Sequence, residues 1–445
     1  MKKNKIGRVR WVLIFWMFVV AAVSYLDRNN ISIAATAIQQ DYRLSNQQLG
    51  AVFSAFVAGY ALSQPIAGRI ADGVGPYRTV IFGMVWWSLF TAGTALVPTG
   101  FGWSLAALMG VRLMLGVGEA VIFPAGNRLV ANWVPNVERG LANGIIFAGV
   151  GVGAGVAPPL ITAILLNRDW HWAFYVSAAI GLAVLLVWIL LVRDRPEQHP
   201  RIGEAEVAYI RAGTKPSELV EPASWSLIVR NRSIRLLAAS YFTYGYVAYI
   251  FFTWFFKYLS SVRGLDLKTS AIYGMLPFIA MALCSPLGGL LGDMLAPRFG
   301  PRAGRCWFAA AMLALCGVFV GLATQVSDAR LATMVLAGGA GALYLAQSAY
   351  WTLSADLAGP SAGAVSGFMN MCNQIGGVAT ASFTPWLADR FGWSTSFSFA
   401  ALLCLLGAMA WLFVDPADSL GRSPLMENEA EDTLDGHGLP MSIGR

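Results

Sequence analysis

Apolar segments of about twenty residues recur along the whole of this chain, and they strongly limit what it can fold into. The first of them, from Trp11 to Tyr25, contains no charged residue. Only 12% of the 445 residues are charged, about half the share that is usual in a soluble domain. We therefore expect an all-α integral membrane protein that crosses the bilayer many times.

A window of about twenty residues predicts about twelve membrane-spanning helices, arranged as two bundles of six. In the first half the expected spans are 11–38, 47–70, 79–98, 102–126, 140–165 and 172–192. In the second half they are 234–258, 269–292, 305–325, 330–353, 362–388 and 394–414. We expect four parts: an N-terminal bundle at 1–192, a central cytoplasmic loop at 193–232, a C-terminal bundle at 233–414, and a disordered, polar cytoplasmic tail at 415–445.

Basic residues are concentrated at the N-terminus and in the central loop, and arginines recur in the short loops on the same side. By the positive-inside rule, this places both termini in the cytoplasm of a multi-pass protein of the inner (plasma) membrane. The N-terminus lacks a cleavage site and leads straight into the first span, so we expect that helix to be retained. The net charge of +7 is explained by these loops and requires no nucleic-acid partner.

The two halves of the chain share motifs at a nearly constant offset. Gly68 and Asp72 recur as Gly289 and Asp293, 221 residues later. The pair Gly140 and Gly144 recurs as Gly363 and Gly367, and Trp170 and Phe174 recur as Trp393 and Phe397, both 223 residues later. This pattern predicts two pseudo-symmetric six-helix bundles; in transporters built from such repeats the substrate site lies between the two halves, near the middle of the membrane.

Two charges, Asp27 and Arg28, lie inside the first span. Over 11–38 that span would be about 42 Å long, enough to cross a bilayer of about 30 Å, so both charges are expected within the membrane. Adjacent helical residues point about 100° apart and cannot pair with each other. Arg112 and Glu119 lie two turns apart on one face of the fourth span and are the candidate partners. A purely structural link between the two spans is the alternative reading.

Several motifs extend these observations. They are residues 25–28 (YLDR), 68–78 (GRIADGVGPYR), 112–120 (RLMLGVGEA), 138–142 (ERGLA) and 199–201 (HPR). Together they resemble the anion:cation symporter family of the major facilitator superfamily. Bacterial members of that family import galactonate, hexuronates, glucarate and related acids together with protons. The resemblance implies the major facilitator fold and proton-coupled uptake of a small organic anion, most simply a sugar acid.

The same resemblance assigns roles to individual residues. It implies that Asp27 and Glu119 carry protons, that Arg28 meets the substrate carboxylate, and that Arg112 couples protonation to the conformational change. Three further residues occupy positions that line the cavity in galactonate-type members: Tyr60, Trp351 and Asn370.

Some expectations come from this chain's own residues. Asn370 and Asn373 fall on one helical turn inside a span, and we expect both to bind substrate, with interhelical hydrogen bonding as the alternative. We expect Asp72, Arg139 and Asp293 to form a latch between conformational states. The fifth span lacks the glutamine that galactonate-type relatives use for sugar hydroxyls, so the substrate is expected to be less hydroxylated or to bind in another pose.

Electrostatics suggests a coupling scheme. Two acids and two bases inside the membrane balance, so an entering anion needs a spare positive charge. Protonation of Asp27 or Glu119 would supply it by freeing an arginine; the sequence leaves open which acid titrates. Import of another carboxylate, such as phthalate or tartrate, and export of drugs or metabolites remain alternatives on the same fold.

Other functional classes have little support in the sequence. The chain has no nucleophile-and-base pair typical of an enzyme and no Walker motif for ATP. Its five cysteines form no CxxC pair, and all three histidines lie in expected loops or the tail, so we expect neither a metal nor another cofactor. A receptor without transport activity is not favoured, because no soluble domain is appended. We expect a monomer whose partners are the anion, protons and the lipid bilayer.

Overall fold

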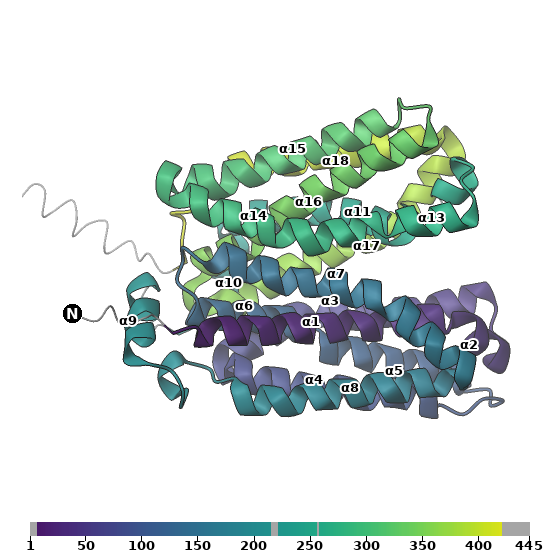
Figure 1. Cartoon of the computed structure of the whole chain (residues 1–445), viewed down its shortest axis with the longest axis horizontal. Coiled ribbons are helices and arrows are strands. Elements are labelled where there is room, and N and C mark those ends of the chain that lie inside the picture. The colour runs from purple at the N-terminus through teal and green to yellow at the C-terminus, as the bar shows by residue number, and fades with distance from the viewer. Residues whose placement is uncertain (1–6, 215–220, 256–257, 421–445) are drawn as a thin grey trace, which may run out of the picture.

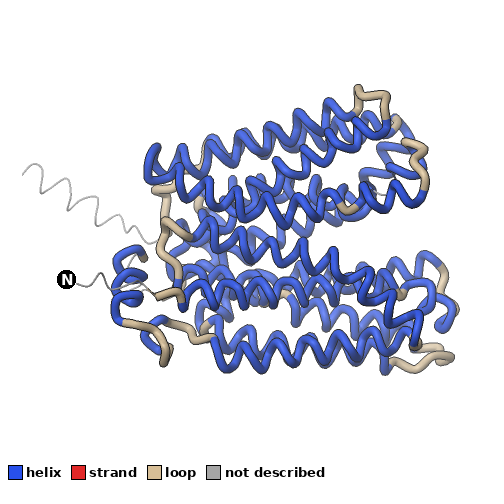
Figure 2. The backbone as a smooth tube through the Cα atoms, viewed as in Figure 1, coloured by secondary structure: helices blue, strands red, loops and turns tan. Residues whose placement is uncertain are grey.

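Helices account for nearly all of the structure, a computed structural model that describes residues 7–214, 221–255 and 258–420; no strand occurs within these ranges (Figure 2). The long helices of the first half are α1 (Val9–Ile33), α3 (Asn46–Val74), α4 (Pro76–Leu96), α5 (Ser104–Glu119), α6 (Ile122–Trp133), α7 (Arg139–Asn167) and α8 (Trp170–Leu191). Those of the second half are α11 (Arg232–Tyr249), α14 (Leu276–Pro301), α15 (Phe308–Ala323), α16 (Ala329–Ala358), α17 (Ala362–Phe391) and α18 (Trp393–Leu412). Shorter α-helices are α2 (Ala35–Tyr42), α9 (Glu204–Gly213), α10 (Trp225–Arg230) and α13 (Leu267–Gly274).

Ten continuous helical stretches in the described chain are long and apolar enough to cross a membrane. Two of them, Ile272–Ala323 and Ala329–Phe391, contain 52 and 63 residues, far more than the roughly 20 that one crossing needs. Each contains a glycine with positive φ where the chain turns back: Gly300 at 86° and Gly359 at 52°. Each stretch therefore crosses twice, which gives the twelve crossings expected from the sequence.

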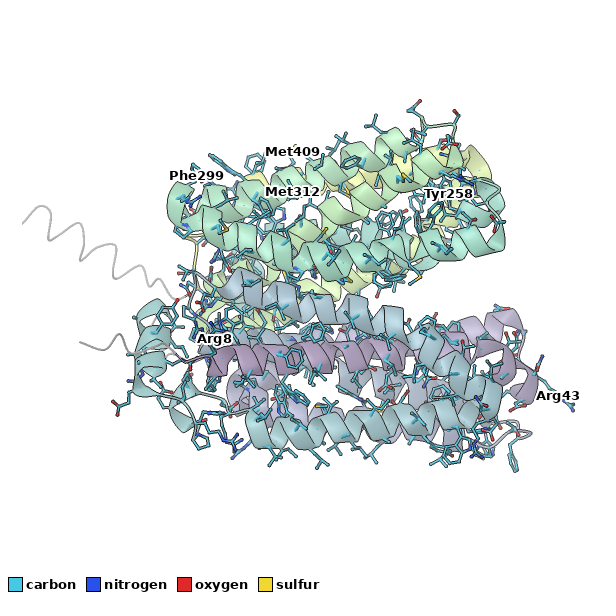
Figure 3. All side chains as sticks on the ribbon, in the orientation of Figure 1. Arg8, Arg43, Tyr258, Phe299, Met312 and Met409 are labelled. Atoms are coloured by element: carbon cyan, nitrogen blue, oxygen red, sulfur yellow. The ribbon has the colours of Figure 1, made fainter. Side chains whose placement is uncertain are left out.

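The helices form two groups that lie one above the other in Figure 1, with α1 to α8 in the lower group and α11 to α18 in the upper. We call one end of the molecule the linker end, because α9 and the start of α1 lie there; the opposite end is the far end. Arg8 marks the linker end and Arg43 the far end in Figure 3. Large apolar side chains on the outer surface are exposed, including Leu62, Leu190 and Phe299, as a lipid-facing surface requires.

Two predicted spans differ from the structure. The first does not run unbroken to Ile38, because α1 ends at Ile33 and the chain bends at Ala34 before α2. The fourth extends to Trp133 and is interrupted between α5 and α6, directly after Glu119. Pro124 explains this break, because its nitrogen cannot donate to a carbonyl of the preceding turn.

The start of the C-terminal tail is docked against the second bundle, contrary to the expectation of disorder from residue 415. Leu420 donates its N–H to the Leu357 carbonyl at 2.9 Å. The Asp418 carboxylate accepts hydrogen bonds from Asn231 Nδ2 at 2.9 Å and from the Ser233 N–H at 3.3 Å. The remainder of the expected tail, 421–445, lies outside the described residues.

The central segment is tied to the first bundle through α9. Glu206 on α9 is fully buried, and its carboxylate accepts the N–H groups of Val9 and Arg10 at 3.1 and 3.2 Å. A carboxylate at this position satisfies donors that the first turn of a helix leaves free. The Arg10 guanidinium also pairs with Glu138 at 2.8 Å. These contacts fix the start of α1, the helix that carries Asp27 and Arg28.

Candidate substrate and coupling site

An ion pair joins α1 to α5 within the first bundle. Arg28 Nε lies 2.8 Å from Glu119 Oε2, which also accepts a hydrogen bond from Ser24 Oγ at 3.2 Å. The Glu119 side chain is fully buried and that of Arg28 is 10% exposed. Aromatic rings surround the guanidinium, whose carbon lies 3.9 Å from the centre of the Tyr60 ring and 4.7 Å from that of Tyr25.

Asp27 and Arg112 lie in the same buried region but form no ion pair within 4 Å in the described structure. Both carboxylate oxygens of Asp27 lack a hydrogen-bond partner among the described residues, although the Thr91 and Ser177 hydroxyls lie close by. Arg112 Nε and Nη1 are likewise unpartnered there. Both residues are at most 2% exposed. The structure thus brings Arg28 to Glu119 and leaves the second acid and the second base near each other but unpaired.

A cavity with an empty volume of about 420 Å³, including space open to solvent, lies between the two bundles beside this ion pair. Tyr25 and Tyr60 line it on the first-bundle side. The lining residues of the second bundle include tyrosines and side-chain amides: Tyr241, Tyr244, Tyr249, Tyr344, Gln347, Asn370, Asn373 and Gln374. No charged side chain lines the described cavity, and Arg28 lies directly behind the two first-bundle tyrosines.

Among the uncharged residues expected to bind substrate, three line the cavity and one lies behind it. Tyr60, Asn370 and Asn373 line the cavity; Asn370 Nδ2 donates to Gln64 Oε1 at 3.0 Å, across the interface between bundles. Trp351 does not line it. This tryptophan is 1% exposed and lies one layer behind, where its Nε1 donates to Tyr241 Oη at 2.9 Å.

Several cavity residues were not anticipated from the sequence. Tyr241, Tyr244 and Tyr249 all project from α11, and Gln347 precedes Trp351 by one turn of α16. Gln374, also in the cavity wall, follows Asn370 by one turn of α17. The two glutamines could have been found from the sequence, because polar residues one turn away from an expected site residue share its helix face.

At the linker end, two aspartates fasten the bundles in a symmetric manner. Asp72, on α3, accepts the N–H groups of Gly363 and Ala364 at the start of α17, both at 2.8 Å. Asp293, on α14, accepts those of Gly140 and Leu141 at the start of α7, at 3.0 and 2.8 Å. The positive end of a helix dipole favours a carboxylate in each case. An arginine stands 3.9 Å from each carboxylate: Arg128 beside Asp72 and Arg305 beside Asp293.

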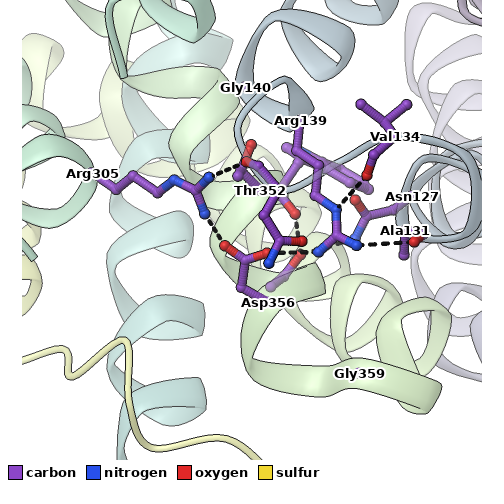
Figure 4. A network of polar contacts seen from close by, with 12 residues as sticks. Asn127, Ala131, Val134, Arg139, Gly140, Arg305, Thr352, Asp356 and Gly359 are labelled. Carbon is purple, nitrogen blue, oxygen red and sulfur yellow. Dashed lines mark hydrogen bonds and ion pairs between the residues drawn. The ribbon is translucent and has the colours of Figure 1, made fainter. Parts of the chain in front are cut away.

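Arg139 belongs to a contact at the same end that is centred on Asp356 of α16 and is linked to Asp293 through Arg305 (Figure 4). Arg139 Nη1 lies 2.7 Å from Asp356 Oδ1, and Arg305 pairs with the other oxygen of the same carboxylate. Arg139 also donates to the carbonyls of Val134 and Ala131. Asp72 and Arg139, expected to form one latch, thus have different partners, and Asp356 joins the second contact.

Comparison with known proteins agrees with this architecture. Residues 17–381 and 276–435 match the Major Facilitator Superfamily. A probable sulfoacetate transporter of Cupriavidus necator is 32% identical over 92% of this chain and 94% of that protein. A hexuronate transporter of Bacillus subtilis is 29% identical, over 91% and 94%. The solved structure of a proton:xylose symporter superposes with a TM-score of 0.70 at 14% identity, covering 91% of this chain and 97% of that one. This chain is therefore a multi-pass membrane transporter, not an enzyme, and it belongs to the Major Facilitator Superfamily.

Proposed function

We propose that this protein imports a small organic anion together with protons, and that the anion is a sugar acid of the hexuronate, galactonate or glucarate type. The observation that carries the proposal is the buried Arg28–Glu119 pair beside a cavity lined by tyrosines and amides. The named activities of the two relatives, transport of a hexuronate and of an organic sulfonate, support an anionic substrate.

Arg28 is the proposed anion-binding residue. Its guanidinium already has a carboxylate partner in Glu119, at 2.8 Å, so a substrate carboxylate has to replace that partner. Protonation of Glu119 would remove the competing negative charge. Because a buried arginine without a counter-charge is strongly unfavourable, Arg28 would then bind the substrate carboxylate in place of Glu119. Proton uptake and anion binding thereby support each other. Tyr60, Asn370 and Asn373 are proposed to contact the rest of the substrate from the cavity wall.

Asp27 is the proposed second proton carrier. Its oxygens are buried and accept no hydrogen bond from described residues, an environment in which a charged carboxylate is costly. Arg112 lies close enough to stabilise the ionised form electrostatically without a direct ion pair. We propose that Arg112 responds to the charge on Asp27 and Glu119 and so relays their protonation to α5.

Alternating access would then proceed by rocking of the two bundles, 1–192 and 233–414, about the central site. The contacts of Asp72, Arg139 and Asp293 all join the bundles at the linker end, which is therefore closed. We propose that this end faces the cytoplasm, with both termini there, and that the protein works as a monomer in the inner membrane. The described conformation is then the one that receives substrate from outside.

Uptake into proteoliposomes under an imposed pH gradient tests the proposal. Labelled galactonate, glucuronate, glucarate, phthalate and sulfoacetate are offered separately, with external pH recorded. We expect accumulation of at least one sugar acid, accompanied by external alkalinisation and abolished by a protonophore. If sulfoacetate or phthalate alone is accumulated, the sugar-acid assignment is wrong. Failure of all five anions to move, or uptake that leaves the external pH unchanged, would refute proton-coupled anion import.

A further inference from the structure

A hydrogen-bonded trio in the second bundle has a defined polarity. Tyr241 Oη accepts hydrogen bonds from Gln347 Nε2 at 2.8 Å and from Trp351 Nε1 at 2.9 Å. An indole N–H and an amide NH₂ can only donate. The phenolic hydrogen of Tyr241 can therefore be directed at neither neighbour, and the described residues offer it no acceptor. Tyr241, which lines the cavity, therefore has an O–H group free to donate a hydrogen bond.

Gln347 supplies the complementary group at the same place. Its Nε2 is used by Tyr241, while its Oε1 is buried and accepts no hydrogen bond within the described chain. The residue is 2% exposed and lines the cavity, so the unpaired oxygen is costly unless a ligand or water reaches it. Because Oε1 and Nε2 belong to one planar amide, the free acceptor lies beside the Tyr241 donor.

We propose that Tyr241 and Gln347 form a subsite for a hydroxyl group of the substrate, with Trp351 as a positioning residue. A hydroxyl is both donor and acceptor, so one group can accept from Tyr241 Oη and donate to Gln347 Oε1. A bare carboxylate can only accept and would leave Gln347 Oε1 unsatisfied. This subsite rests on the proposed function and restricts it to hydroxylated anions.

Trp351 acts through Tyr241 and does not touch the substrate. Its indole ring packs against Phe123 and Phe147, with ring centres 5.9 and 5.2 Å away, which fixes the direction of its N–H. Without that N–H, Tyr241 gains freedom to turn and to donate elsewhere. The second bundle thereby offers an amide for hydroxyl recognition, whereas the Gly-rich stretch 144–151 of the fifth span contains no glutamine.

Calorimetric titration of the purified full-length protein in nanodiscs tests the subsite. The probes are D-glucuronate, D-galactonate and their monodeoxy analogues. In the unaltered protein, removal of one particular hydroxyl should weaken binding about tenfold to hundredfold. Tyr241→Phe should weaken the parent compound by a similar factor and abolish discrimination against that one analogue. Gln347→Met should do the same.

A double-variant comparison separates positioning from packing. Trp351→Phe should weaken parent binding severalfold in the unaltered background and have no further effect in the Tyr241→Phe background. Tyr350→Phe is the matched control: it removes another buried phenol of the same aromatic cluster, 4.5 Å from the Tyr241 ring, that does not line the cavity. The control should leave discrimination among analogues unchanged.

Three results would overturn the inference. One is that Tyr241→Phe weakens the parent and every analogue equally; another is that Trp351→Phe costs the same in both backgrounds. The third is that the unaltered protein binds phthalate or sulfoacetate as tightly as the sugar acids. That result would refute the hydroxyl subsite but not the proposal that the protein imports an organic anion. Absence of binding for every anion would instead overturn the proposed function itself.

Discussion

The two aspartates at the linker end allow a sharp test of how the bundles separate. Asp72→Asn removes the negative charge from a carboxylate that accepts two N–H groups of α17 at 2.8 Å each. The asparagine oxygen can keep one of these bonds, but its NH₂ group opposes the other donor. Hydrogen bonds to a charged group contribute about 1.5–3 kcal/mol each and neutral ones about 1 kcal/mol. Taken at the lower end of the charged range, a net loss of about 2 kcal/mol follows, which shifts the closed–open equilibrium about thirtyfold.

Hydrogen exchange of individual amides measures that equilibrium. Opening of the linker end releases the Asp72-bonded amides of Gly363 and Ala364 and, in the same motion, the Asp293-bonded amides of Gly140 and Leu141. Asp72→Asn should therefore accelerate exchange about thirtyfold at all four amides, including the pair on the opposite contact. Asp293→Asn is the matched variant on the other contact, and it should accelerate exchange at the same four amides, including Gly363 and Ala364 beside Asp72.

Concerted opening of the two contacts is refuted if the acceleration of exchange stays local. Faster exchange at the start of α17 alone would mean that Asp72 only caps that helix and that the two contacts open independently. Unchanged exchange at Gly363 and Ala364 would mean that the carboxylate contributes nothing to closure.

Three further outcomes are expected. Arg28→Ala should abolish substrate binding, whereas Asp27→Asn should retain substrate exchange and lose proton-driven accumulation; equal loss of exchange in both would contradict the division of roles. Gly68→Ala would place a methyl carbon 2.0 Å from a facing carbonyl oxygen of α17, so it should open the linker end in the same exchange assay, while Gly73→Ala, which meets no atom within 4 Å, should not. Burial lowers the pKa of His199 below its usual value of about 6.5, so its stabilising contribution is complete above that pH and is lost as the pH falls toward the lowered pKa. Cleavage of the central segment by trypsin, measured relative to cleavage of an unfolded peptide of the same sequence at each pH, should therefore be faster at pH 5.5 than at 7.5, and His199→Gln should remove that difference.

Much of the architecture follows from patterns that are local in the chain. Apolar segments of membrane length and the recurrence of Gly68 and Asp72 at Gly289 and Asp293 predict twelve crossings in two related halves. The exclusion of an Asp27–Arg28 pair needed only helical geometry. The break after Glu119 was missed, because a twenty-residue hydropathy window does not register one proline nitrogen that cannot donate.

The cavity was harder to predict, because its members are brought together by tertiary packing. Periodicity cannot tell a tyrosine that lines a cavity from one behind it, and this ambiguity explains Trp351, which lies behind Tyr241. Gln347 is one turn from Trp351, yet nothing in its sequence surroundings indicates that one end of its amide is paired and the other free. The partners of Asp72 were unforeseeable for a further reason: they are backbone groups, which carry no sequence signature.

The glycine crossings at the linker end bear on how readily the transporter can cycle. A Cβ on Gly68 would lie 2.0 Å from the Gly363 carbonyl oxygen, and a Cβ on Gly289 equally close to that of Gly140. At these two crossings backbone meets backbone, with the Asp72 and Asp293 carboxylates beside the contact. Separation there breaks the hydrogen bonds of these two carboxylates, but no bulky side chain has to withdraw from a socket or find its place again on closure. The close approach of the two backbones lowers the internal friction at these two points, while the Arg139–Asp356 ion pair at the same end still has to break in every transport cycle.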